Sequence, residues 1–182
     1  MLLDTPEADS GWPAADFSLP DTEGRTITLT EVRGEDGFLI AFICNHCPYV
    51  LAIIDRFVED ASRLQSSGIG VVAIMSNDYG AYPDDRPEKM IDFADQHNFT
   101  FPYLVDESQE AARNYGAVCT PDFFGFDRAG LLRYRGRLDD ARMGDATNRD
   151  PELLNAMLSV NDPDAHSTTQ HSSMGCSIKW RR

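Results

Sequence analysis

The sequence predicts a single α/β domain in which helices flank a central mixed β-sheet, with a β-hairpin at the N-terminal end. Two continuously apolar segments, 37–43 and 70–75, have the composition of strands that are buried on both faces. Between them, apolar residues recur at helical spacing over 50–64, and charged residues occupy the opposite side. A strand, a helix and a second strand in this order predict a parallel pair with a right-handed crossover.

The N-terminal hairpin and the start of the first long helix follow from local composition. Residues 16–19 and 25–29 alternate apolar and polar side chains, and the segment 20–24 between them has the composition of a turn. Pro48 is compatible with a helix that starts at about residues 44–47, because the first four N–H groups of a helix have no partner within it.

The remaining elements continue this alternation up to residue 160. The acidic residues Asp84, Asp85 and Glu88 are expected to cap or lead into the helix that follows them. The short turn at 128–130 predicts an antiparallel hairpin, because it leaves no room for a crossover. The predicted elements are a helix over 87–98, a strand over 103–105, a helix over 108–115, hairpin strands over 122–127 and 131–135, and a last helix over 151–160.

The length of the chain, 182 residues, fits one domain that buries a core without disulfide bonds. We predict a domain over residues 1–160, with its core over about 13–160, and a C-terminal tail over 161–182. The tail begins with a polar, aperiodic linker. It ends in a more apolar stretch at 174–180, which is expected to pack back on the domain.

The charge of the chain argues against several classes of partner. Its 30 acidic and 16 basic residues give a formal net charge of −14, which disfavours binding to nucleic acid or to an anionic membrane surface. The N-terminal residues lack the basic start and the apolar run of a secretory signal, and the longest apolar run is too short to span a bilayer. We therefore expect a soluble, cytoplasmic protein.

Two thiols, Cys44 and Cys47, are separated by two residues at the junction between the first buried strand and the helix. A thiolate at a helix N-terminus is stabilised by free backbone N–H groups and by the helix dipole, which lowers its pKa. A structural zinc site needs four ligands, and no second CxxC pair or HxxxH motif accompanies this one. The spacing and position therefore favour a redox dithiol over a zinc or copper site, and we assign no metal.

Four stretches carry a family likeness: CNHCPYV at 44–50, CTPDFF at 119–124, YRGRLDD at 134–140 and GCSIKW at 175–180. They resemble the peroxiredoxin-like branch of the redoxin group, which is related to alkyl hydroperoxide reductases and thiol-specific antioxidants (AhpC/TSA). The likeness runs from about Pro13 to the C-terminus. It implies a thioredoxin-like fold and an antioxidant oxidoreductase.

The resemblance also implies how the site is arranged. A cis peptide bond between Thr120 and Pro121 is expected to face the dithiol, leaving the N–H and C=O of Thr120 free to pair with an extended substrate. In the usual thioredoxin assignment, Cys44 is the exposed nucleophile and Cys47 resolves the mixed disulfide.

An alignment with peroxiredoxins gives a second assignment, in which Cys47 takes the place of the cysteine that attacks peroxide. The proline and threonine that normally precede that cysteine are Ile40 and Cys44 here, and the expected arginine falls at about Pro121. Without the arginine and the threonine, a peroxide loses its hydrogen-bonding groups, so we expect weak hydroperoxide reduction at most.

The buried acid of thioredoxins, six residues before the first cysteine, is replaced by Phe38. No carboxylate at that position can therefore accept the proton of Cys47. A protonated His46 beside either thiol would stabilise a thiolate and partly compensate, and the alternative is a solvated histidine in the loop. The supporting residues of the predicted site are Asn45, His46, Pro48, Cys119, Thr120 and Pro121.

Two further cysteines have alternative interpretations. Cys119, two residues before Pro121, is either a third redox thiol or a buried side chain that fills space. Cys176 in the tail is either an additional redox thiol that resolves a disulfide or part of a tail that docks through Ile178 and Trp180.

These observations predict a thiol-disulfide oxidoreductase that needs no cofactor. We expect its Cys44–Cys47 dithiol to react with a disulfide of a protein or small molecule, or with a hydroperoxide, and to be restored by an external thiol reductant. One alternative is a peroxiredoxin-like hydroperoxide reductase that attacks through Cys47. The other is a non-enzymatic copper or zinc carrier that uses Cys44, Cys47 and His46.

Overall fold

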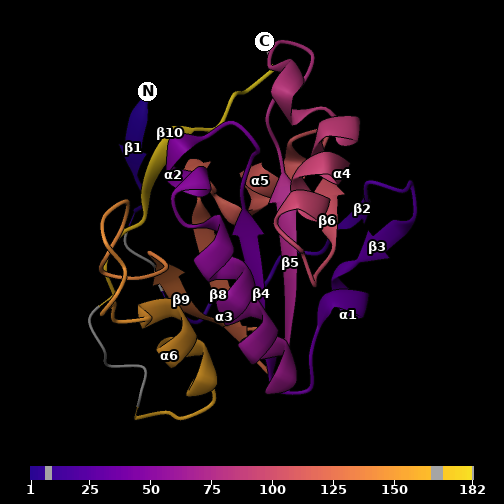
Figure 1. The fold of residues 1–182 in the computed structure, drawn as a ribbon. Helices are drawn as coiled ribbons and strands as arrows, with labels where there is room; N and C mark the ends of the chain where they lie inside the picture. Colours follow the sequence, from indigo (N-terminus) through magenta and orange to yellow (C-terminus); the bar gives the residue numbers. More distant parts are fainter. Residues whose placement is uncertain (7–9, 165–169, 182) are drawn as a thin grey trace.

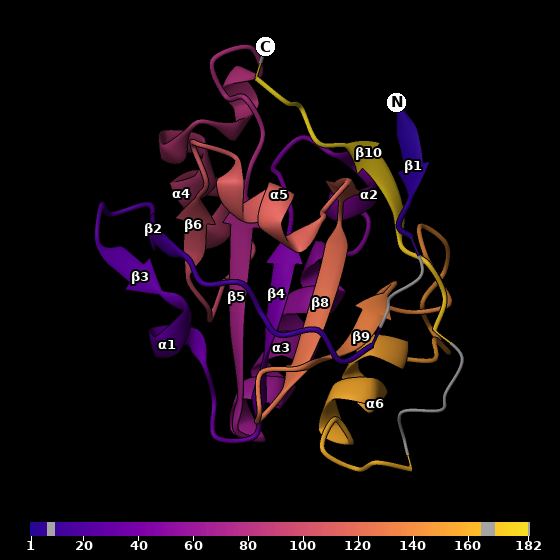
Figure 2. The same cartoon turned by 180° about the vertical axis from the view of Figure 1, so that it is seen from behind.

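The computed structural model describes residues 1–6, 10–164 and 170–181, and a mixed sheet lies at its centre (Figure 1). The strands of this sheet are β4 (Gly37–Phe42), β5 (Ile69–Met75), β6 (Tyr103–Val105), β8 (Asp122–Asp127) and β9 (Leu132–Gly136). β4 pairs antiparallel with β8, and β8 with β9, whereas β5 pairs parallel with β6. β4 and β5 lie side by side with their arrows in the same direction (Figures 1 and 2), and the N–H of Ile43 donates to the carbonyl of Ile74 at 3.1 Å.

Helices cover both faces of this sheet, which confirms the predicted α/β class. In front of the sheet in Figure 1 lie α2 (Pro48–Leu51), α3 (Ile54–Ser66), α4 (Pro87–Gln96) and α6 (Glu152–Leu158). On the face turned to the viewer in Figure 2 lies α5 (Glu110–Tyr115), with α1 (Leu29–Val32) toward the edge. The side chains of β4 point alternately into two hydrophobic cores, one on each face of the sheet. Leu39 and Ala41 pack with α3, and Phe38, Ile40 and Phe42 pack with α5.

The N-terminal hairpin is also confirmed. β2 (Ser18–Pro20) pairs antiparallel with β3 (Thr26–Thr28). Thr28 then caps α1, because its side chain accepts from the N–H of Glu31 while the Glu31 carboxylate accepts from the N–H of Thr28 at 2.8 Å. The four residues of α1 are too few to give a periodic signal in the sequence.

The first long helix begins where Pro48 predicts, with Cys47 as the N-cap and Pro48 as its first residue. A single helix over 50–64 is wrong, however, because the structure divides it into α2 and α3. Ile53 has a φ of −118°, outside the helical range, and its N–H bonds to the carbonyl of Val50, three residues back, at 3.0 Å. The CxxC motif therefore precedes a short, separate helical segment.

A second, small sheet was not predicted. Its strands run in the order β1 (Leu2–Asp4), β10 (Met174–Ser177) and β7 (Cys119–Thr120), and both pairings are antiparallel. It joins the two ends of the chain to the segment before Pro121. Of the predicted linker, residues 165–169 lie outside the described residues. No helix in the described ranges is long and apolar enough to cross a membrane.

Candidate active site

The two thiols of the CxxC motif face the loop at Pro121. Cys44 follows β4, and Cys47 caps α2. The Sγ of Cys44 lies 3.3 Å from the Oγ1 of Thr120, and the Sγ of Cys47 lies 3.1 Å from the carbonyl oxygen of Thr120. The peptide bond between Thr120 and Pro121 is cis. The dithiol and the cis-proline loop, 73 residues apart in the chain at Cys47 and Thr120, thus form one site.

Neither thiol is exposed, which corrects the expectation that Cys44 is an accessible nucleophile. Cys44 is 1% exposed and Cys47 is 0% exposed, and both are free cysteines. Two segments enclose the loop that carries them. One is the short 3₁₀ helix η1 (Pro83–Asp85), to which Asn45 donates from its backbone N–H and its side chain. The other is β10, which packs beside α2.

The surroundings of the two sulfurs differ electrostatically. The hydrogen bond from Cys44 lowers the pKa of Cys47 well below its usual range, against the effect of burial, and the backbone N–H groups of Cys176 and Val50 lower this pKa further. The hydrogen bond to Cys47, burial and the negative charge of Asp85 raise the pKa of Cys44. The carbonyl of Thr120, which accepts from the Cys47 thiol at 3.1 Å, acts in the opposite direction because it suits the protonated form. The two pKa directions therefore make Cys47 the more acidic thiol of the pair.

Asp85 belongs to the site, although the sequence gives no sign of it. It was expected to cap or lead into α4, but Arg86 is the N-cap and the Asp85 carboxylate is fully buried. Its Oδ1 accepts from the N–H of Asn45, and its Oδ2 accepts from the side chain of Asn77, both at 2.9 Å. The turn composition of 83–87 gives no sign of this role, because the carboxylate contacts a loop forty residues earlier.

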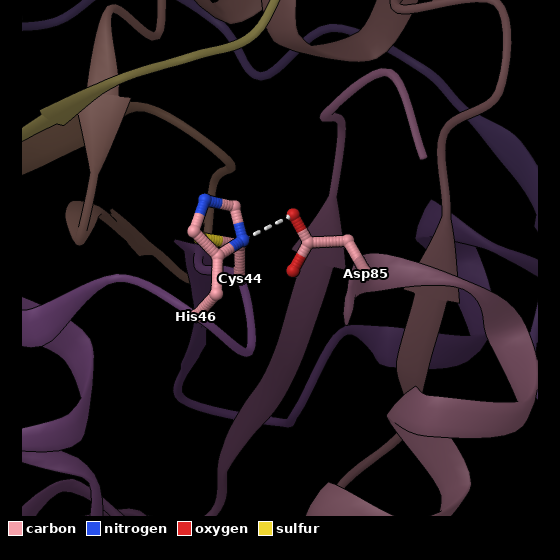
Figure 3. Close-up of side chains that lie close together, drawn as sticks. All are labelled: Cys44, His46 and Asp85. Atoms are coloured by element: carbon pink, nitrogen blue, oxygen red, sulfur yellow. Dashed lines mark ion pairs between the residues drawn. The ribbon is translucent and has the colours of Figure 1, made fainter. Parts of the chain in front are cut away.

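His46 pairs with this carboxylate (Figure 3). Its Nδ1 lies 2.8 Å from the Oδ2 of Asp85, and the two groups form an ion pair when the imidazole is protonated. The interaction with Asp85 raises the pKa of His46, against the effect of burial. The ring also stacks on Tyr82, with the planes 6° apart. His46 is therefore held in place, and it is not the freely solvated loop histidine of the alternative interpretation.

One group of side chains in the described part of the chain has the composition of a metal site. Ligand atoms of Cys44, His46 and Asp85 all lie within 4.8 Å of one another. Cys47, which the carrier hypothesis expects as a ligand, is not part of this group. The Nδ1 of His46 already faces Asp85.

Phe38, which stands where thioredoxins have a buried acid, does not face the dithiol. Its side chain is buried on the face of β4 away from the dithiol, where its ring stacks on Phe126 at a centroid distance of 4.8 Å. A carboxylate at position 38 would point into that second core. Asp85, from another part of the chain, is the buried carboxylate that the structure brings to the CxxC loop.

The edge of the cis-proline loop is not free, which corrects a second expectation. Thr120 pairs with Cys176 across β7 and β10. Gly175 packs so closely that a Cβ atom built on it would lie 2.0 Å from the carbonyl oxygen of Thr120. The chain's own C-terminal strand therefore occupies the place where an extended substrate was expected to pair.

The two remaining cysteines lie on this same pair of strands. Cys119 is fully buried, and burial together with the charge of Asp122 raises its pKa. This environment favours the interpretation that Cys119 fills space. Cys176 is only half-buried, and it packs against the core cluster that contains Cys44 and Cys47.

A buried strand that ends in a CxxC pair, a helix capped by the second cysteine and a facing cis-proline loop define a thiol-disulfide oxidoreductase with a thioredoxin-like fold. The thioredoxin domain of a thiol-disulfide oxidoreductase from Bacteroides vulgatus shares this fold, with a TM-score of 0.64 at 13% identity over 85% of this chain and 99% of that one. The chain belongs to the AhpC/TSA family, whose sequence model matches residues 10–135. The predicted fold and family are therefore confirmed.

Relatives that are named as a peroxiredoxin and as a thiol-disulfide oxidoreductase support the same chemistry. The chain is 25% identical to peroxiredoxin Bcp of Escherichia coli K12 over 69% of this chain and 76% of that protein. It is 25% identical to thiol-disulfide oxidoreductase ResA of Halalkalibacterium halodurans over 91% of this chain and 84% of that protein. An uncharacterized conserved protein from Geobacillus kaustophilus matches with a TM-score of 0.91 and 38% identity, over 100% of this chain and 97% of that one. The oxidoreductase prediction is confirmed, and thiol chemistry is favoured over the metal-carrier hypothesis.

Proposed function

We propose that the protein exchanges disulfides with Cys47 as the attacking thiolate and Cys44 as the thiol that resolves the mixed disulfide. This reverses the roles expected from thioredoxins. It is supported by the position of Cys47 at the N-cap of α2 and by its lowered pKa, to which a hydrogen bond from Cys44 and the nearby backbone N–H groups of Cys176 and Val50 contribute. Cys44 instead lies beside the carboxylate of Asp85, whose charge opposes a thiolate there.

The proposed cycle needs no group beyond the two thiols and their partners. The Cys47 thiolate attacks one sulfur of a substrate disulfide, that bond breaks, and half of the substrate leaves as a thiolate. Cys44 then gives up its proton and attacks the Cys47 sulfur, which releases the second half as a thiol. The protein ends as a Cys44–Cys47 disulfide, and an external thiol system in the cytoplasm returns the two electrons.

Hydroperoxide reduction is the second candidate, because a Cys47 thiolate and the Bcp relative are compatible with it. The structure offers less support for a bound peroxide. Arg135, on the strand after β8, is held by the carboxylate of Asp122 at 2.9 Å and by the carbonyl of Gly116 at 2.8 Å. Its guanidinium is therefore not free to donate hydrogen bonds to a bound peroxide. Disulfide exchange is the favoured reaction.

The test is a count of free thiols over time in reduced protein mixed with oxidised glutathione or, separately, with hydrogen peroxide. We expect two thiols to be lost with the disulfide at a higher second-order rate than with peroxide. A faster loss with peroxide would favour the second candidate. No loss with either reagent would overturn the assignment of an active dithiol.

A further inference from the structure

Strand β10 lies where an extended substrate of the proposed reaction would pair. Cys176 is the strand partner of Thr120, and the N–H of Ile178 donates to the carbonyl of Val118 at 3.0 Å. Figures 1 and 2 show β10 (yellow) crossing beside α2 at the end of the sheet where the dithiol lies. Both sulfurs of the pair are buried, and β10 is one of the two segments that enclose the loop carrying them.

Cys176, on β10, packs against the core cluster that contains both thiols of the dithiol. Its backbone N–H contributes to the stabilisation of the Cys47 thiolate, and its side chain interacts with the Cys47 side chain. Unlike Cys44 and Cys47, it is only half-buried. One thiol of the protein therefore reaches both the buried pair and the surface.

The position of Cys176 is fixed on both sides along the strand. Before it, the hydroxyl of Ser173 donates to the carbonyl of Pro121 at 2.7 Å, and the N–H of Ser173 donates to Thr5 at 3.0 Å. After it, the N–H of Lys179 donates to the side chain of Asn77 at 2.8 Å. These bonds hold β10 against the site from two directions, as a bound substrate strand would be held.

We propose that Cys176 is a third redox thiol, which exchanges with the Cys44–Cys47 disulfide and carries the disulfide bond to the accessible edge of the site. This rests on the proposed function of the dithiol. Cys176 loses its proton and attacks the Cys47 sulfur, so that the Cys44–Cys47 bond breaks and a Cys47–Cys176 bond forms. Cys44 leaves as a thiolate and takes up a proton. No electrons enter or leave in this step, and an external thiol then attacks the Cys176 sulfur.

The charges around Cys176 favour this exchange in the oxidised protein. In the reduced protein, burial and the neighbouring Cys47 raise the pKa of Cys176, while Lys179 lowers it. Once Cys47 is part of a disulfide, it carries no charge. Cys47 then no longer raises the pKa of Cys176, although burial still does. Cys176 therefore loses its proton more readily when a disulfide is present to attack.

Cys119 provides a matched control on the partner strand. It lies opposite Ser177, one position from the Thr120–Cys176 pair, and it is fully buried. Burial and Asp122 raise its pKa, and Arg135 lowers it only in part. Cys119 therefore shares the location of Cys176 without its access to solvent, and Cys119→Ala is expected to leave the exchange intact.

Trypsin separates the cysteines for a direct test. Cleavage after lysine and arginine places Cys44 and Cys47 in peptide 34–56, Cys119 in peptide 114–128 and Cys176 in peptide 150–179. A Cys44→Ser variant is oxidised with diamide, blocked with iodoacetamide, digested and examined by mass spectrometry. We expect a cross-link between peptides 34–56 and 150–179 in most monomers. It should persist when Cys119→Ala is added and vanish when Cys176→Ser is added. A cross-link to peptide 114–128, or an alkylated Cys47, would overturn the inference.

A rate measurement separates this inference from the proposed function. With Cys44–Cys47 oxidised beforehand, we expect Cys176→Ser to slow reduction by glutathione about tenfold or more, and Cys119→Ala to change it less than about twofold. An unchanged rate in Cys176→Ser would overturn the role of Cys176 and leave the dithiol function standing. A failure of the wild-type protein to form the Cys44–Cys47 disulfide would instead overturn the proposed function.

Discussion

Cys44 and Cys47 are three positions apart in the chain, yet their surroundings are opposite in electrostatic character. Cys47 is the N-cap residue of α2, and the Cys44 thiol and the nearby backbone N–H groups of Cys176 and Val50 lower its pKa. Cys44 lies in the preceding loop, between the hydroxyl of Thr120 and the buried charge of Asp85. The difference makes the second cysteine the more acidic of the two, because hydrogen-bond donors stabilise a negative charge and a nearby carboxylate opposes one.

This comparison also shows which parts of the chain set the chemistry. Asp85 comes from the segment before α4, and Cys176 comes from the C-terminal tail. Asp85 raises the pKa of Cys44, and the backbone N–H of Cys176 lowers the pKa of Cys47. The CxxC motif supplies the two thiols, and distant segments add to the pKa shifts that the hydrogen bond between these thiols causes.

The largest effect is expected from removing the thiols one at a time. Cys47→Ser removes the proposed nucleophile, so the rate of exchange with oxidised glutathione should fall on the order of 10³-fold or more. Cys44→Ser should still attack the substrate and form an adduct with glutathione, detected as an increase in mass. The opposite pattern, with an inert Cys44→Ser and a reactive Cys47→Ser, would restore the thioredoxin assignment.

A smaller effect is expected from Gly175→Ala, which acts on the Cys47 side of the pair. The new Cβ would meet the carbonyl oxygen of Thr120 at 2.0 Å, so β10 must move away from β7. We expect the free energy of unfolding in urea to fall by about 1–3 kcal/mol. The pKa of Cys47 should rise as the N–H of Cys176 withdraws, which a titration of thiolate absorbance measures.

Gly144→Ala is the matched control for this substitution. Its nearest contact would be the carbonyl oxygen of Ala141 at 3.2 Å, so a change below about 1 kcal/mol is expected. Equal stability losses in the two variants would contradict the close packing of β10 on β7.

Asp85→Asn tests the buried carboxylate that lies beside Cys44. It removes a buried charge that accepts from Asn45 and Asn77, so we expect a loss of about 1–3 kcal/mol in the free energy of unfolding. The pKa of His46 should fall toward its ordinary value, which NMR titration of the imidazole measures. Asp84→Asn, at an exposed neighbouring position, should change stability by less than about 0.5 kcal/mol.

The stability difference between the wild-type protein and Asp85→Asn should change with pH in one direction. Asp85 raises the pKa of His46 in the folded protein, so the stabilisation from their ion pair is complete below the unfolded pKa of about 6.5. It is lost as the pH rises through the folded pKa. The stability gap between wild type and Asp85→Asn should therefore narrow from pH 5.5 to pH 8, and a gap that widens would contradict the ion pair.

The sequence was sufficient for the central elements because they carry long, periodic patterns. β4 is a run of six buried residues, and Pro48 marks the start of α2. The CxxC motif and the Cys119–Pro121 stretch were found for the same reason, as local features with a known chemical meaning. The division of the helix at Ile53 was not predicted, because the apolar spacing continues across it.

The parts that could not be predicted depend on contacts between distant segments. Asp85 lies in a turn of ordinary composition, and nothing local distinguishes its buried carboxylate from those of exposed neighbours. β10 has four residues, including a glycine, and it becomes a strand because β7 and β1 flank it. The exposure expected for Cys44 was wrong for the same reason, since β10 and η1 bury the loop.

The most direct test of the central claim is the ionisation state of each cysteine in the reduced protein. Cysteine labelled with ¹³C at Cβ reports deprotonation of its own sulfur by NMR without any reagent entering the site, and single Cys→Ser variants assign the signals. At pH 7 we expect the thiolate signal at Cys47 and the thiol signal at Cys44, with Cys47 titrating at the lower pH. A thiolate at Cys44 beside a protonated Cys47 would contradict the account.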